Sequence, residues 1–344
     1  MATEKSESTG QLPMMKLSLL GLLLVAPFIA LSASPMSDNA ALWFFGVLPV
    51  IIGLFGGSRL AFGAALLTPT LMGISLLLRD FPLAGAIYMA IVGAAVGFSA
   101  MRGWHGMASF SAPLAAFALI GAPEVALASG TVPADSSFRS GLVMVAFIAA
   151  GGLWTLLVGR YISAELELHR PPSVSFRVAR YFALSLAGMV GVATYVDMQW
   201  LHSPASWWII LTLFVVVQPY YAASGRRVVA RVVGTLVGAV LALLVVDLLQ
   251  DYPLAISIVA LVLTMVAPVL NMKAPYWGYV SFLTPAVVLQ TTGGTDAIVS
   301  GTIERAVYTV IGAVAAIIVL TIGHAVVMKR SRTKEGRSAV LHGS

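Results

Sequence analysis

Two arginines stand near the beginning of apolar runs in this sequence, where a positive charge is unusual. Arg139 opens the run near 139–159, and Arg305 lies in the first turn of the run 303–328. A cation near a membrane is costly unless it pairs, reaches the surface or faces water. One interpretation makes both residues interfacial anchors, with Arg305 paired to the adjacent Glu304 or another carboxylate. The other makes them line an anion path, because a guanidinium binds a carboxylate through two hydrogen bonds.

Three further arginines follow a Gln-Pro pair between two apolar runs. Arg226, Arg227 and Arg231 come soon after Gln218 and Pro219, and this charge density predicts a cytoplasmic turn between two membrane helices. The arginines could anchor the turn and attract anionic lipid headgroups, or could form a funnel that concentrates organic anions. A proline near a helix end frees a backbone carbonyl, which Gln218 can bind unless it binds a ligand. Arg226, Arg231 and Gln218 are therefore candidate substrate-binding residues.

Aromatic residues gather at the predicted ends of two apolar runs. Trp207 and Trp208 lie near the predicted outer face, and Tyr276 and Tyr279 near the inner one. Such rings usually form the aromatic belt of a membrane interface. For a substrate with a ring, some of them could instead stack on it. Trp207 and Tyr276 are kept as candidate substrate-binding residues for that reason.

Acidic side chains that could carry a proton are scarce in the apolar runs. Asp247 and Glu304 are the best candidates, and both lie close to the predicted outer side. If transport is coupled to protons, one of them should exchange the proton. If transport needs neither residue, a facilitated or channel-like path is favoured.

Other chemistry has little support in the sequence. It contains no Gly-x-x-x-x-Gly-Lys-Ser/Thr phosphate-binding loop, its five histidines have no metal-ligand spacing, and it has no Cys. We therefore expect no cofactor, no metal and no catalytic residue, and the chain is not predicted to be an enzyme. The net charge of +6 does not indicate a nucleic-acid partner, because the positions of the charges follow a membrane pattern.

Composition predicts a polytopic membrane protein. Apolar residues make up 59% of the chain and charged residues 10%, far from the values of a soluble domain. Runs of about 17–25 apolar residues can cross a bilayer as helices. The sequence predicts an all-α fold with twelve such runs, near 16–33, 40–57, 60–78, 83–101, 106–122, 139–159, 179–196, 205–220, 231–249, 253–271, 275–291 and 303–328.

The distribution of basic residues predicts the orientation. Of the 20 Lys and Arg residues, all but Arg79, Arg139 and Arg305 fall in alternate segments. Because Lys and Arg collect on the cytoplasmic side, both termini are predicted to be cytoplasmic.

An internal repeat accounts for the number of runs. Lys16 to Phe44 align without a gap on Arg180 to Trp208, and Arg79 to Ala84 align on Gln250 to Ala255. Two six-helix halves that enter from the same side form parallel repeats, a fused pseudo-dimer. The predicted domains are a disordered cytoplasmic N-terminus (1–13), a first membrane repeat (14–160), a cytoplasmic linker (161–178), a second repeat (179–328) and a basic cytoplasmic tail (329–344).

The second repeat also carries a family resemblance. A Trp-containing run, Gln218-Pro219, Arg226-Arg227 and Arg231-x-x-Gly-Thr-x-x-Gly are followed by Tyr276-Trp-Gly-Tyr-Val-Ser-Phe-Leu-Thr-Pro and by Glu304-Arg305. This order of motifs, over residues 176–328, resembles the fusaric acid resistance protein-like family. That superfamily includes bacterial aromatic acid exporters, with plant aluminium-activated malate transporters as distant relatives.

The resemblance implies a transporter in the bacterial inner membrane. Its substrate would be a small organic carboxylate, often aromatic, exported from the cytoplasm on the proton gradient. A periplasmic adaptor protein is a candidate partner, beside the lipid bilayer and the organic anion itself. Two alternatives remain open: an anion channel or facilitator like the malate branch, and a non-transporting membrane scaffold component.

Overall fold

A computed structural model describes most of the chain. The described residues are 14–32, 34, 36, 40–121, 126–127, 130–131, 137–160, 172–219, 221–252, 255–256, 258–260, 262–263, 266–267, 270, 274–291 and 295–341. The predicted disordered segment 1–13 and most of the predicted linker lie outside them. So does much of the predicted run 253–271.

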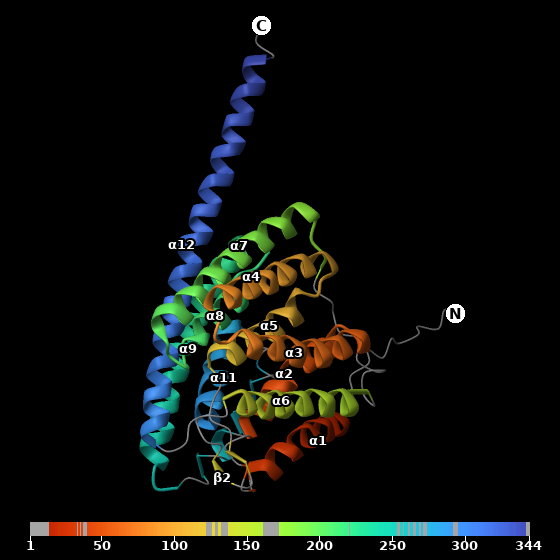
Figure 1. The fold of residues 1–344 in the computed structure, drawn as a ribbon, viewed down its shortest axis with the longest axis vertical. Coiled ribbons are helices and arrows are strands. Elements are labelled where there is room, and N and C mark those ends of the chain that lie inside the picture. Colours follow the sequence, from red (N-terminus) through yellow and green to blue (C-terminus); the bar gives the residue numbers. More distant parts are fainter. Residues whose placement is uncertain are drawn as a thin grey trace, which may run out of the picture. The chain divides into compact units, whose positions relative to one another are not determined.

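The described residues are almost wholly helical (Figure 1), so the predicted all-α class is confirmed. The exception is a pair of two-residue antiparallel strands, β1 (Ala126–Leu127) and β2 (Gly130–Thr131). The α-helices are α1 (Met14–Ser32), α2 (Ala40–Phe55), α3 (Ser58–Leu78), α4 (Pro82–Ser99), α5 (His105–Ile120), α6 (Ser137–Arg160), α7 (Phe176–Val196), α8 (Trp207–Val216), α9 (Tyr221–Leu249), α11 (Tyr276–Thr291) and α12 (Thr295–Leu341). Two short turns follow α4 and α7: the 3₁₀ turn η2 (Ala100–Arg102) and the π-helical turn η4 (Asp197–Leu201).

Six of the described helices are long and apolar enough to cross a membrane. They are the spans Ser58–Leu78, Pro82–Arg102, Phe138–Arg160, Phe176–Leu201, Ser224–Leu249 and Ile298–Thr321. The remaining apolar helices are shorter than the roughly 20 residues that a perpendicular crossing needs. The structure thus supports a multi-pass membrane protein, whereas the predicted number of twelve crossings stays a prediction.

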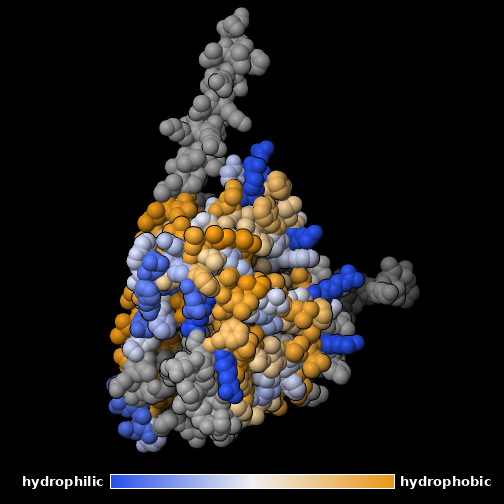
Figure 2. Space-filling view, in the orientation of Figure 1, coloured by the Kyte–Doolittle hydropathy of each residue, from blue (hydrophilic) through white to orange (hydrophobic). Residues whose placement is uncertain are grey.

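The surface is as apolar as expected of a membrane protein whose exterior faces lipid. Figure 2 shows apolar side chains over much of the visible face. Leu248 is 74% exposed, and Leu184, Val192 and Leu77 are each 65% exposed. A soluble monomer rarely presents so much contiguous apolar surface to water, so these side chains fit a lipid-facing exterior.

The described chain divides into two compact units. The first comprises residues 1–70 and 124–171, and the second comprises 71–123 and 172–344. In the first, α2 packs closely on α6, because a Cβ at Gly46 would collide with the backbone of Ile148 and one at Gly151 with that of Trp43. The indole N–H of Trp154 donates to the carbonyl of Leu23 at 2.9 Å and ties α6 to α1.

In the second unit, glycines let two helix pairs approach closely. A Cβ at Gly97 of α4 would collide with the backbone of Ala183 in α7. A Cβ at Gly234 of α9 would lie 2.5 Å from the Trp277 carbonyl of α11, and one at Gly238 would lie 2.7 Å from that of Ser281. This small-residue face is a familiar way to pack membrane helices, and the Gly-x-x-x-Gly motif of the sequence serves it here.

Two helices extend beyond their predicted ends. The sequence predicted a charged turn up to residue 231, but α9 begins at Tyr221 and carries Arg226, Arg227 and Arg231 on helical backbone. The prediction of a turn was wrong because it treated all three charges as equally exposed, whereas a helix turns successive residues to different faces. Similarly, α12 continues past the predicted end at 328 to Leu341, alongside α9 in its first part (Figure 1).

Gly97→Ala should lower the stability of the protein, because the added methyl group collides with backbone that cannot yield. We expect a loss of about 1–3 kcal/mol, the usual cost of overpacking. Gly188→Ala is the matched control, since an added Cβ there meets nothing within 4 Å. Thermal unfolding in detergent should show a lower Tm for Gly97→Ala alone, and equal Tm values for the two variants would contradict the close contact.

Candidate functional site

Arg305 lies deep inside the second unit. It is ten residues from the start of α12 and only 1% exposed, so it sits about 15 Å along the helix axis. The neighbouring Glu304 is exposed. Among the described residues no carboxylate pairs with Arg305, and its Nε and Nη1 atoms are buried without a hydrogen-bond partner. This burial does not fit a residue that anchors the helix at a membrane surface.

An indole ring covers the Arg305 guanidinium. The Cζ atom of Arg305 lies 4.0 Å from the ring centroid of Trp208 on α8. A close approach of the two helices permits this contact, because a Cβ at Gly312 would lie 2.9 Å from the Ile209 carbonyl. The interaction offsets part of the cost of burying the charge, by about 2 kcal/mol in a desolvated place.

Two more arginines reach the same region from α9. Arg231 is 3% exposed, and its Nε atom has no partner. Arg227, one turn earlier, places its Cζ atom 4.8 Å from the ring centroid of Tyr276 on α11, and its Nε atom also lacks a partner. The charges of these two arginines and of Arg305 all act on the buried Tyr279, and those of Arg231 and Arg305 act on each other. The fold thus places the positive charges of Arg227, Arg231 and Arg305 near one another.

We call this cluster the arginine site. It consists of Arg227, Arg231, Arg305, Trp208, Tyr276 and Tyr279, and the rings of Tyr276 and Tyr279 lie 6.0 Å apart. The Tyr276 hydroxyl is buried and has no hydrogen-bond partner. Helices α8, α9, α11 and α12 all contribute, so the site depends on their mutual packing.

Each of these four helices also carries a buried threonine whose hydroxyl has no partner: Thr212, Thr235, Thr284 and Thr309. Elsewhere in the same unit, Thr194 donates to the Val190 carbonyl at 2.8 Å and Thr302 to the Ile298 carbonyl at 2.7 Å. In a membrane helix, a threonine hydroxyl usually finds its partner in this way, by donating to the carbonyl four residues earlier. The four partnerless hydroxyls therefore add polar groups to an otherwise apolar interior.

The arrangement is chemically suited to an anion. An uncompensated buried charge costs several kcal/mol, and two guanidiniums with free N–H groups can recover this by binding a carboxylate. The flanking indole and phenol rings offer an apolar and aromatic wall for the rest of an organic anion. Guanidiniums do not hold metal ions, and no group of three potential metal ligands occurs among the described residues.

The structure brings three predicted site residues together: Arg305, Arg231 and Tyr276. Trp207 lies one residue away from the site. Its ring is 4.8 Å from that of Phe117 and 4.0 Å from that of Trp208, and it is buried. Both tryptophans are buried within the second unit, and the interpretation as belt residues stays a prediction.

The other predicted residues stay outside the arginine site. Arg226 is exposed on α9, and Arg139 is exposed on α6 in the first unit. The side-chain amide of Gln218 donates to the carbonyls of Val215 and Val217, so it caps the end of α8. The two predicted proton carriers, Asp247 and Glu304, are both exposed.

Sequence reasoning missed Trp208, Tyr279 and Arg227 as members of the site. A usable signal was present, because Arg227, Arg231 and Thr235 recur every four residues, as do Arg305 and Thr309. That spacing puts polar side chains on one face of a helix. It was not applied because the segment before Arg231 was predicted to be a turn.

The comparisons with known proteins point to the same part of the chain. Residues 173–319 match the family described as fusaric acid resistance protein-like. The resemblance seen in the sequence is thereby confirmed for this stretch. The match includes every residue of the arginine site and fits a membrane transporter.

One relative adds a second similarity. Over 105 residues, the chain is 35% identical to a protein of Escherichia coli (strain K12) named "Uncharacterized protein YhfK". The alignment covers 30% of this chain and 14% of that relative's length. No solved structure matches.

Arg305→Met should raise the stability of the protein. Methionine keeps the length of the side chain and removes a buried charge, and such replacements often stabilise by about 1–4 kcal/mol. Thermal unfolding in a halide-free buffer measures the change, with the exposed Arg226→Met as control and an expected effect within about 0.5 kcal/mol. A lower Tm for Arg305→Met than for Arg226→Met would show that Arg305 serves the fold.

Proposed function

We propose that this protein is a transporter that moves small organic carboxylates across the membrane, with the arginine site as its binding site. The observation that carries the proposal is the burial of Arg305 and Arg231 in one place without a counter-ion among the described residues. A side chain kept at such a cost in an apolar interior usually serves function. The match to the transporter family over the same residues supports this proposal.

The chemistry of the site favours an anion with a ring. The carboxylate would neutralise the guanidiniums of Arg305 and Arg231, and the ring would lie against Trp208, Tyr276 or Tyr279. An aliphatic carboxylate would satisfy the charge but lose the aromatic contact. We therefore expect aromatic carboxylates to bind more tightly than aliphatic ones of the same charge.

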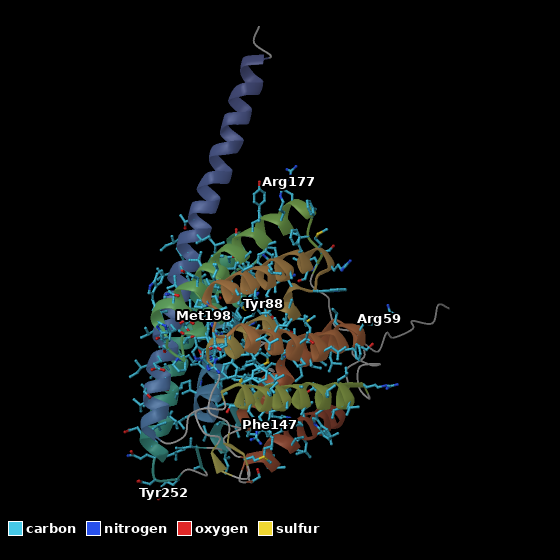
Figure 3. All side chains as sticks on the ribbon, viewed as in Figure 1. Arg59, Tyr88, Phe147, Arg177, Met198 and Tyr252 are labelled. Carbon is cyan, nitrogen blue, oxygen red and sulfur yellow. The ribbon has the colours of Figure 1, made fainter. Side chains whose placement is uncertain are left out.

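The proposed setting is a bacterial inner membrane, with twelve crossings in two parallel repeats and both termini in the cytoplasm. The alternation of basic residues supports that orientation. Within the second unit, Arg177 at the start of α7 and Tyr252 after the end of α9 lie at opposite ends (Figure 3), and the proposed orientation puts Arg177 on the cytoplasmic side. We further propose export rather than import, with a periplasmic adaptor as a candidate partner.

Replacing Arg305 by Gln should abolish transport, because the guanidinium supplies the contact with the carboxylate. The measurement is uptake of radiolabelled benzoate and succinate into proteoliposomes loaded with the same unlabelled anion, so that exchange needs no energy source. Arg226→Gln is the matched control, since it removes an equal charge from an exposed position. We expect exchange to fall at least tenfold for Arg305→Gln and to stay near the wild-type rate for Arg226→Gln.

Other outcomes separate the competing functions. Equal exchange in both variants would remove the arginine site from the path. Anion currents that follow the electrochemical gradient of the anion alone would favour a channel. An inactive wild-type protein, shown to be folded and inserted, would favour the scaffold interpretation.

A further inference from the structure

A buried carboxylate lies at the junction between α7 and α8. Asp197 opens the π-helical turn η4 and is 2% exposed, and neither of its carboxylate oxygens has a hydrogen-bond partner among the residues that the structure describes. The turn ends at His202, which adopts a left-handed conformation with φ of 49°. Single π turns often occur at functional sites, and a left-handed conformation outside glycine is uncommon.

The groups around Asp197 leave its charge largely uncompensated. His202 is the charged group that acts on it among the described residues, and that side chain is exposed. Ser206 lies beside the carboxylate, but its hydroxyl donates to the Ser203 carbonyl. Met198, the next residue of the turn, packs against α4, where a Cβ at Gly85 would lie 2.8 Å from its sulfur atom. The Tyr88 hydroxyl of α4 is committed to the Leu71 carbonyl.

In such surroundings, the protonated and the charged forms of a carboxyl group differ strongly in free energy. In the charged form, a buried carboxylate without partners is strongly destabilised, and binding a proton removes that cost. The two forms also differ in their hydrogen bonds, because only the protonated form can donate. Asp197 is therefore suited to accept and release a proton, whereas the side chains of Asp247 and Glu304 are exposed.

We propose that Asp197 is the proton-binding site of this protein and that its protonation is coupled to the arginine site. The coupling rests on the transport function proposed above, while proton binding by Asp197 does not. It needs no redox partner: the carboxylate takes one proton from the solution on one side and returns it to the other side.

The short helix α8 joins the two sites. Ser206, which neighbours Asp197, immediately precedes α8, and Trp208 in the first turn of that helix covers Arg305. Because Ser206 adjoins both the Asp197 carboxylate and the start of α8, gaining or losing the proton changes the charge beside the beginning of that helix. Proton and anion both act on the same ten-residue helix, which is the requirement for coupled binding.

Infrared difference spectroscopy tests proton binding directly. Wild-type protein, compared with Asp197→Asn at pH 5, should show an additional C=O band of a protonated carboxyl group. Glu304→Gln should retain the band, and Ser206→Ala should shift it, because Ser206 adjoins Asp197. The idea fails if the wild type has no band that Asp197→Asn removes. Should Asp197→Asn not fold, an unshifted band in Ser206→Ala is the contrary result.

Transport measurements test the coupling. In proteoliposomes, Asp197→Asn should retain benzoate exchange in the absence of a pH gradient but lose accumulation driven by that gradient. Arg305→Gln should lose both, and Asp247→Asn should lose neither. Gradient-driven accumulation that persists in Asp197→Asn overturns the coupling and leaves the transporter proposal intact. Loss of exchange as well would show that Asp197 serves the fold or the anion site, which equally overturns its role as a coupling residue.

Discussion

The second unit is organised around a guanidinium that is buried without a counter-ion in the described part of the chain. In an apolar interior, Arg305 has the Trp208 ring on one side and free N–H groups elsewhere. A second buried cation, Arg231, adds repulsion to the cost of desolvation. Other contacts must therefore hold the surrounding helices together. Binding of an anion would relieve the repulsion between the two arginines.

Close packing of the helices supplies those contacts. The glycines of α9 and α12 bring these helices close to the backbone of their neighbours. Dispersion contacts and helix packing, rather than the hydrophobic effect, hold helices together in lipid. The threonines without partners and the buried arginines lie on these same helices. Tight apolar packing and a few polar groups thus occupy the same interfaces.

Sequence reasoning predicted the class of the fold well, because the thickness of a bilayer fixes the length of an apolar run. It also selected Arg305, Arg231 and Tyr276 for the site, because unusual charges and rings in apolar runs stand out. It chose Trp207 over its neighbour, since adjacent residues differ only in the direction that a helix gives them. Asp197 was passed over because its burial arises from the π-helical turn after α7, which is not visible in a single run of residues.

The depth of Arg305 has an electrical consequence. The candidate membrane span of α12 begins at Ile298, so Arg305 lies about 10 Å along it, inside a hydrocarbon layer roughly 30 Å thick. In the proposed orientation, part of the membrane voltage would fall between an anion bound there and the cytoplasm. Moving one charge through the full voltage is worth about 2.3 kcal/mol per 100 mV. In a cell that is negative inside, this voltage drives anions outward, so binding from the cytoplasm would itself be favoured by the membrane potential.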